Sequence, residues 1–137
     1  MSANTTPIFA ITPKSTKAVI AAVNTARDGS GTLTTLFTAG ANGARVDYIS
    51  FISAQATPAT AAAKVFRIFL TDTSGANPWL FKEVAAAGVT ASATLSGQTA
   101  LVTEFIPLEA GQSIMVSQSV YGSAADQTHV TARGGQY

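Results

Sequence analysis

Residues 32–53 read TLTTLFTAGANGARVDYISFIS, and this stretch decides the fold class. It holds two runs rich in Thr, Leu, Phe, Val and Ile, which are residue types that favour strands. Between the runs lies Asn42-Gly43, a strong signal for a tight turn. We therefore expect two strands, Thr32–Thr38 and Arg45–Ser53, joined by this turn.

The second run carries apolar residues on both of its faces. We expect it to be a central strand, with one face in the core and the other against a partner. Strict alternation places Val46, Tyr48 and Ile52 on one face and Asp47, Ile49 and Phe51 on the other.

Short runs of the same kind, separated by turn signals, continue to the end of the chain. In one of them, Lys64–Thr71, we expect Lys64 and Arg67 to lie outside the core or at an edge. No stretch predicts a persistent helix, so a parallel α/β sheet is excluded. We expect an antiparallel β-sandwich of about eight strands, with jelly-roll-like connections. The further strands are expected at Lys17–Asn24, Lys64–Thr71, Trp79–Ala85, Ala100–Ile106, Ser113–Val120 and Thr128–Arg133, with a short additional strand allowed at Val89–Leu95.

The first 16 residues differ from the rest because they are rich in Thr, Ser and Pro. Two prolines there favour extended backbone, and Ile8, Phe9 and Ile11 lie between them. A frayed terminus is one interpretation. We favour an extended arm at 1–16 that anchors on a neighbouring subunit, followed by a single β-sandwich domain at 17–137.

Composition indicates a protein that works by packing against others. Charged residues make up 11% of the 137, against about 25% in an average soluble domain. A surface so weakly charged is tolerated where neighbours cover it, which favours a homo-oligomer or lattice component. Residues 1–45 carry four cations and one acid (+3), and residues 46–137 carry four cations and six acids (−2). A basic front docking on an acidic neighbour fits this distribution; nucleic-acid binding would need a denser basic patch.

Residues capable of chemistry are few. There is no cysteine, and the one histidine, His129, lies inside a strand pattern. The sequence has no G-x-S-x-G motif that would supply a serine nucleophile for this histidine to activate. We therefore expect His129 at a surface or interface. Glu104 and Glu109 flank a strand-to-turn junction, so we do not expect them to form the carboxylate pair of a glycosidase. The turns at Asp28 and Asp72 offer one carboxylate each, which is too few to bind calcium. We expect no enzyme, no metal and no cofactor.

The sequence also bears on location and on ligand binding. MSANTTPIF has no signal-peptide pattern, and no apolar run reaches the ~20 residues of a membrane span, so synthesis and assembly in a cytoplasm are expected. Four aromatic residues could form a sugar-stacking platform, although Trp79 at a strand start is more typical of a core lid or interface anchor. That platform would use Tyr48, Trp79, Tyr121 and Tyr137.

The segment 35–49, TLFTAGANGARVDYI, resembles a pattern in small structural proteins of tailed bacteriophages, in which a TAGANG turn followed by (A/S)-R-(I/V) joins two strands. Elements like 65–70, 80–84 and 108–114 accompany it, so the resemblance covers roughly residues 32–120. It implies a virion protein, with a capsid decoration or cement role leading and a tail or baseplate protein as the rival.

A decoration protein would bind the major capsid protein and form homo-oligomers, trimers first, without nucleic acid or membrane. A binding module for carbohydrate or receptor is the alternative from another class. The expected interface residues are Ile8, Phe9 and Ile11, followed by Trp79, Tyr121 and Tyr137.

Overall fold

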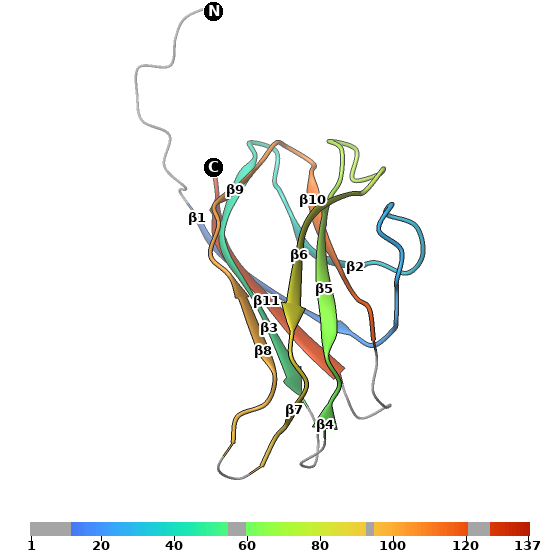
Figure 1. Ribbon diagram of the computed structural model, residues 1–137. Helices are drawn as coiled ribbons and strands as arrows, with labels where there is room; N and C mark the ends of the chain where they lie inside the picture. The colour runs from blue at the N-terminus through green and yellow to red at the C-terminus, as the bar shows by residue number, and fades with distance from the viewer. Residues whose placement is uncertain (1–11, 55–59, 93–94, 121–126) are drawn as a thin grey trace, which may run out of the picture.

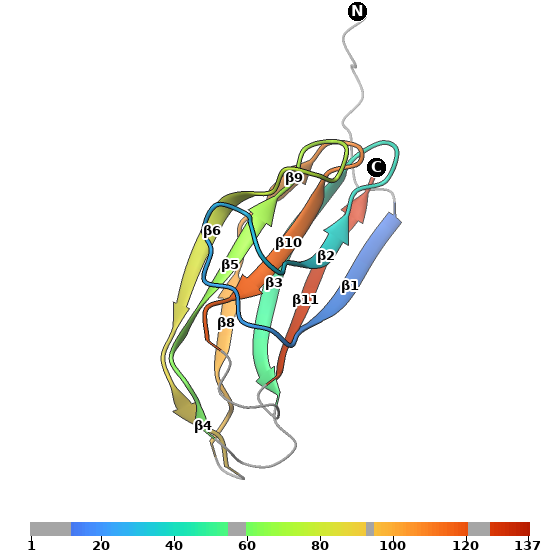
Figure 2. The same cartoon turned by 90° about the vertical axis from the view of Figure 1, so that its right-hand side faces the viewer.

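The computed structural model describes residues 12–54, 60–92, 95–120 and 127–137 (Figure 1). In these ranges every regular element is a β-strand, and the strand pairs are antiparallel. The main strands form two sheets that pack face to face (Figures 1 and 2). The expected fold class, an antiparallel β-sandwich, is confirmed.

The first sheet has the order β1-β11-β3-β8, and β9 pairs with β3 further along the edge that β8 occupies. The expectation that the run at 45–53 is a central strand is therefore confirmed, because β3 lies between β11 and the β8–β9 edge. The bounds are β1 Thr12–Ile20, β11 Gln127–Gln136, β3 Ala44–Ala54, β8 Thr99–Val102 and β9 Ile106–Leu108.

The second sheet has the order β2-β10-β5-β6. A separate ribbon of two very short strands, β4 and β7, lies beyond one end of it (Figure 1). The bounds are β2 Thr34–Thr38, β10 Ser113–Gln118, β5 Lys64–Leu70, β6 Trp79–Ala86, β4 Thr60–Ala61 and β7 Val89–Thr90.

Strand pairing across the two sheets is nested. β1 pairs with β11, β2 with β10, β3 with β8 and β9, and β5 with β6. The first strand thus lies beside the last, as in one long hairpin ribbon wound into two sheets. We interpret this connectivity as that of a jelly roll.

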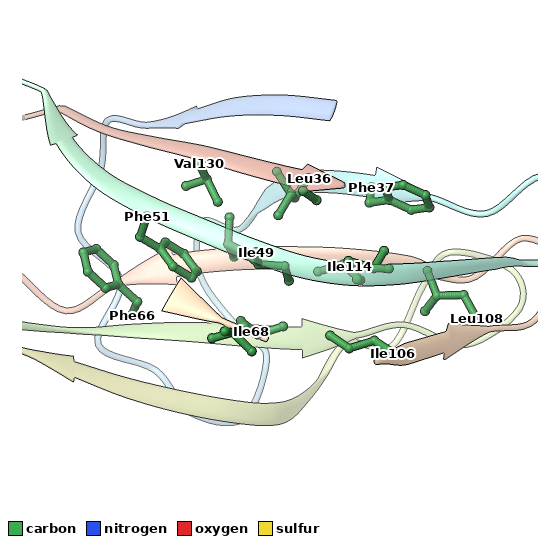
Figure 3. Close-up of a cluster of buried hydrophobic side chains, with 14 of the residues drawn as sticks. Leu36, Phe37, Ile49, Phe51, Phe66, Ile68, Ile106, Leu108, Ile114 and Val130 are labelled. Atoms are coloured by element: carbon green, nitrogen blue, oxygen red, sulfur yellow. The ribbon is translucent and has the colours of Figure 1, made fainter. Parts of the chain in front are cut away.

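The core lies between the sheets and takes side chains from both (Figure 3). Phe51 of β3 stacks on Phe66 of β5, with ring centroids 4.6 Å apart and planes 13° from parallel. Ile68 of β5 and Ile114 of β10 are fully buried beside them. These β-branched and aromatic side chains supply the apolar area that holds the two sheets together.

Two strand boundaries differ from those expected. β1 begins at Thr12, so residues 12–16 belong to the first sheet, paired with β11, and are not part of a separate arm. The run expected at 100–106 is interrupted, and its two halves pair with β3 as β8 and β9. The expected anchors Ile8, Phe9 and Ile11 lie outside the described residues.

A bulge breaks the alternation of β3. Arg133 of β11 lies opposite Tyr48, whereas the next residue, Gly134, lies opposite Val46. Asp47 is therefore an extra residue in β3. An extra residue interrupts the alternation of inward and outward side chains, so the residues before it and after it no longer follow one continuous pattern.

Because of this bulge, the expected assignment of β3 residues to its two faces is wrong. Val46, Ile49 and Phe51 are all fully buried in the core, although strict alternation placed Val46 on the opposite face from the other two. Tyr48 and Ile52 point away from the core, as a face against a partner requires.

The outer face of the second sheet is covered by the chain itself. The connection 21–33 runs across it (Figure 2), and the backbone N–H of Asn24 donates to Gln118 O of β10 at 2.9 Å. Arg67 Nη1 of β5 donates to Asn24 O at 3.1 Å. Phe69 of β5 is completely buried as well, although it lies outside the main core cluster.

The expected position of Lys64 and Arg67 is wrong, because both side chains are buried. Arg67 does point out of the sandwich, as alternation in β5 requires, but the connection 21–33 closes over it. Its Nε donates to Glu83 Oε1 of β6 at 2.7 Å, which pairs the buried charge.

Candidate functional site

Among the described residues, no segment covers the outer face of the first sheet in this way, and we call this face the open face. Pairing between strands fixes its rows: Val19 lies beside His129, which lies beside Ile52. The open face consists of outward side chains of β1, β11, β3 and the β8–β9 edge: Lys17, Val19, Arg45, Asp47, Tyr48, Ser50, Ile52, Leu101, Thr103, Phe105, His129, Thr131 and Arg133.

Four large apolar side chains are exposed on the open face. The exposed fractions are 45% for Val19, 46% for Ile52, 59% for Leu101 and 69% for Phe105. Single exposed apolar residues are ordinary, but several on one sheet face make that face a candidate interaction surface.

Two shallow hollows adjoin on the open face. One, of about 630 Å³, is lined by residues of β3, β8 and β11, among them Tyr48, Leu101 and Arg133. The other, of about 480 Å³, lies over β1 and β11 beside Val19 and His129. Ile52 of β3 and Thr131 of β11 line both hollows. They therefore stand at the centre of the open face.

Charged groups on the open face lie against its aromatic rings. Arg45 Nε donates to Asp47 Oδ1 at 2.7 Å, and the Arg45 guanidinium lies 5.3 Å from the centroid of the Phe105 ring. The Arg133 guanidinium lies 5.8 Å from the centroid of the Tyr48 ring. Such contacts hold the cations in place while leaving their outer sides available to a partner.

Lowered carboxyl pKa values occur away from the open face, in turns and in an ion pair. The pKa of Asp72 is lowered to about 2, first by the Ser74 hydroxyl and then by the Asn77 amide. A hydrogen bond from the Ser30 hydroxyl lowers the pKa of Asp28. The Arg67 hydrogen bond lowers that of Glu83. Each carboxylate stabilises local structure.

The open face offers groups of several chemical kinds. It holds one carboxylate, one imidazole and three cationic side chains among aliphatic, aromatic and hydroxyl side chains. Across the described ranges no three His, Cys, Asp or Glu side chains come together as a metal site would require. In the same ranges no helix is long and apolar enough to cross a membrane.

Of the interface residues expected from sequence, the structure describes two. Trp79 is exposed on β6 near exposed Phe81, on an edge of the second sheet and not on the open face. Tyr137 is half-buried, and its backbone N–H donates to Gly43 O. Tyr121, like the three residues of the expected arm, lies outside the described residues. The structure therefore does not join these candidates into one site.

Sequence reasoning missed Val19, Leu101 and Phe105 as members of one surface. Val19 and Leu101 stand at outward positions of their strands, which alternation alone indicates, and Phe105 directly precedes β9. That they share a face follows only from the pairing of β1, β11, β3 and β8, which joins segments far apart in sequence. His129, expected at a surface or interface, is exposed between Val19 and Ile52.

No protein-family model matches the sequence, and no curated protein matches it. Among solved structures, a chain from the "Structure of infectious bursal disease virus Gt strain" is similar, with 16% sequence identity and a TM-score of 0.30. The similarity covers 98% of this chain and 34% of that one, so this chain spans about a third of its length. A likeness of this degree identifies neither a family nor a partner.

Proposed function

We propose that this chain is a structural protein of a virus particle, a capsid decoration or cement protein that stabilises a phage head shell. The observation that carries the proposal is the open face, where four large apolar side chains are exposed on one sheet while the chain covers the other sheet itself. The low charge of the sequence and the resemblance of residues 32–120 to phage structural proteins support the same function.

The mechanism is burial of apolar surface. At about 25 cal/mol per Å², an interface of about 1,600 Å² gives a large gross stabilisation, part of which offsets the entropy lost on docking. Because a shell repeats the contact by symmetry, a modest net gain at each site adds up over the particle.

Assembly of copies with one another is part of the proposal, with a trimer expected. Light scattering behind a sizing column measures the mass of the purified chain directly. A mass near three times 13.9 kDa supports a trimer. A monomer at all concentrations would contradict assembly in solution.

The experiment that tests the decoration role uses head shells from the source that lack this chain. Purified chain is added, the shells are sedimented, and their thermal disruption is followed by light scattering. The proposal predicts saturable binding and disruption at a higher temperature. Shells that bind no chain, or that gain no thermal stability, would contradict it. Binding to tails and not to heads would favour the tail or baseplate role.

A carbohydrate- or receptor-binding module is the second candidate. The observation in its favour is the hollow where Tyr48, Asp47 and Arg133 meet the hydroxyls of Ser50 and Thr131. Aromatic rings beside hydrogen-bonding groups suit a sugar. Binding on a glycan array that is lost in Tyr48→Ala would favour this candidate, whereas a decoration protein is expected to bind nothing there.

A further inference from the structure

We infer that the open face docks on an acidic protein surface of the shell; this inference rests on the function proposed above. Ile52 of β3 and Leu101 of β8 supply the apolar contact, and Lys17 of β1 and Arg133 of β11, which lie on the β1–β11 side of them, select a partner that carries carboxylates.

Charge is distributed unevenly between the open face and the remaining molecule. Lys17, Arg45 and Arg133 lie on this face with one carboxylate, Asp47, among the described residues, which gives 3 − 1 = +2. The whole chain is +1, so everything else sums to −1. Complementary potentials select partners and speed their encounter, so a partner with acidic groups around an apolar centre fits this surface.

Charge also argues against a second copy packed on the same face. Two open faces in contact would bring together two surfaces that each carry a net positive charge from Lys17, Arg45, Arg133 and Asp47. Like charges across an interface disfavour the complex. The single Asp47 of each copy is already bound to Arg45 at 2.7 Å.

Edge strands are a less suitable route to a partner than the open face. The free edge strand β1 carries Pro13, Lys14 and Lys17, and proline and lysine discourage addition of a further strand. The edge strand β6 has a register irregularity opposite Ile68 and Phe69 of β5, which serves the same purpose. Docking by the face leaves these edges undisturbed.

The test measures binding of the purified chain to shells that lack it, by co-sedimentation at about 0.05 M and about 0.5 M NaCl. Binding is expected to weaken about tenfold at the higher salt, because the ions screen the contact. Lys17→Gln should weaken it about threefold at low salt. Thr25→Glu makes the same change in net charge at an exposed site on the connection 21–33 and should leave binding near that of the unaltered chain.

A second pair of variants tests the apolar centre. Ile52→Asp should weaken binding at least about thirtyfold, as expected for a central contact residue. Val23→Asp is the matched control, because Val23 is also β-branched and is 49% exposed, against 46% for Ile52, but lies on the connection 21–33. Circular dichroism and thermal melting establish that all four variants fold.

The outcomes separate this inference from the proposed function. If the unaltered chain binds no shells at either salt concentration, the decoration role itself fails. If it binds but neither salt nor Lys17→Gln weakens binding, the partner surface is not acidic and the inference is overturned. Equal loss in Ile52→Asp and Val23→Asp also overturns it. So does an oligomer that Ile52→Asp alone dissociates, because a second copy would then cover the face.

Discussion

Arg67 lies on the outward side of β5, yet its side chain is nearly inaccessible to solvent and is held by Glu83 and the carbonyl of Asn24. Arg27 binds the same Glu83 oxygen from the solvent side, at 3.0 Å. The two arginines therefore offer a direct comparison of a buried and an exposed partner for one carboxylate.

Arg67→Ala is expected to lower the free energy of unfolding by about 3 kcal/mol, because it leaves buried polar groups without their partner. Arg27→Ala, which removes the exposed partner, should cost less than about 1 kcal/mol. Urea denaturation of the two variants measures the difference. Equal costs would contradict the burial of Arg67.

Asp72 organises the turn between β5 and β6. It accepts hydrogen bonds from the Ser74 hydroxyl, from the Asn77 side chain and from the backbone N–H groups of Ala76 and Ser74. These bonds favour the ionised form and hold the pKa at about 2, below the ordinary value of 3.8.

A folded-state pKa below the unfolded one means that Asp72 stabilises the fold above about pH 4 and loses that effect as the pH falls through about 2. Asp72→Asn is therefore expected to be less stable than the unaltered chain at pH 7. The gap should narrow between pH 4 and pH 2. Thermal melts across this range measure it, and a gap independent of pH would show that the charge of Asp72 is not the cause.

At the scale of elements, the connection 21–33 determines which sheet face is covered. The Asn24 side chain organises it: Nδ2 donates to the carbonyls of Ser30 and Thr32, and Oδ1 accepts from the backbone N–H of Ala26. These bonds hold an irregular segment in one conformation over β10 and β5.

Asn24→Ala should loosen this cover and lower the free energy of unfolding by about 2 kcal/mol. Hydrogen exchange is expected to quicken in β10 and β5, which lie beneath the connection, while the amides of β3 and β11 stay protected. Urea denaturation gives the first quantity and exchange followed by NMR the second. Uniform loss of protection in both sheets would contradict a local role for Asn24.

Element positions were largely predictable from sequence because turn residues separate runs of strand-forming residues. Thr34–Thr38 and Trp79–Ala86 lie where those runs predict them. The bulge at Asp47 was not predictable, since it arises where β3 meets Gly134 of β11, more than 80 residues later. The burial of Arg67 escaped prediction for the same reason: its cover is remote in sequence.

At the scale of the whole molecule, the two sheet faces differ in what covers them. Sparse charge indicated from sequence alone that some surface is made to be covered, but not which one. The open face is assembled from five strands that only the folded topology brings together, and its exposed Ile52 and Leu101 lie opposite the self-covered side. A decoration protein needs this asymmetry, because one side faces the shell and the other faces solvent.

The most direct measurement is cryo-electron microscopy of head shells with the chain bound, at a resolution that orients the β-sandwich. The account predicts that the open face, with Ile52 at its centre and Lys17 and Arg133 beside it, lies on the shell against acidic side chains, while the connection 21–33 faces outward. A bound chain whose open face points to solvent would contradict the account.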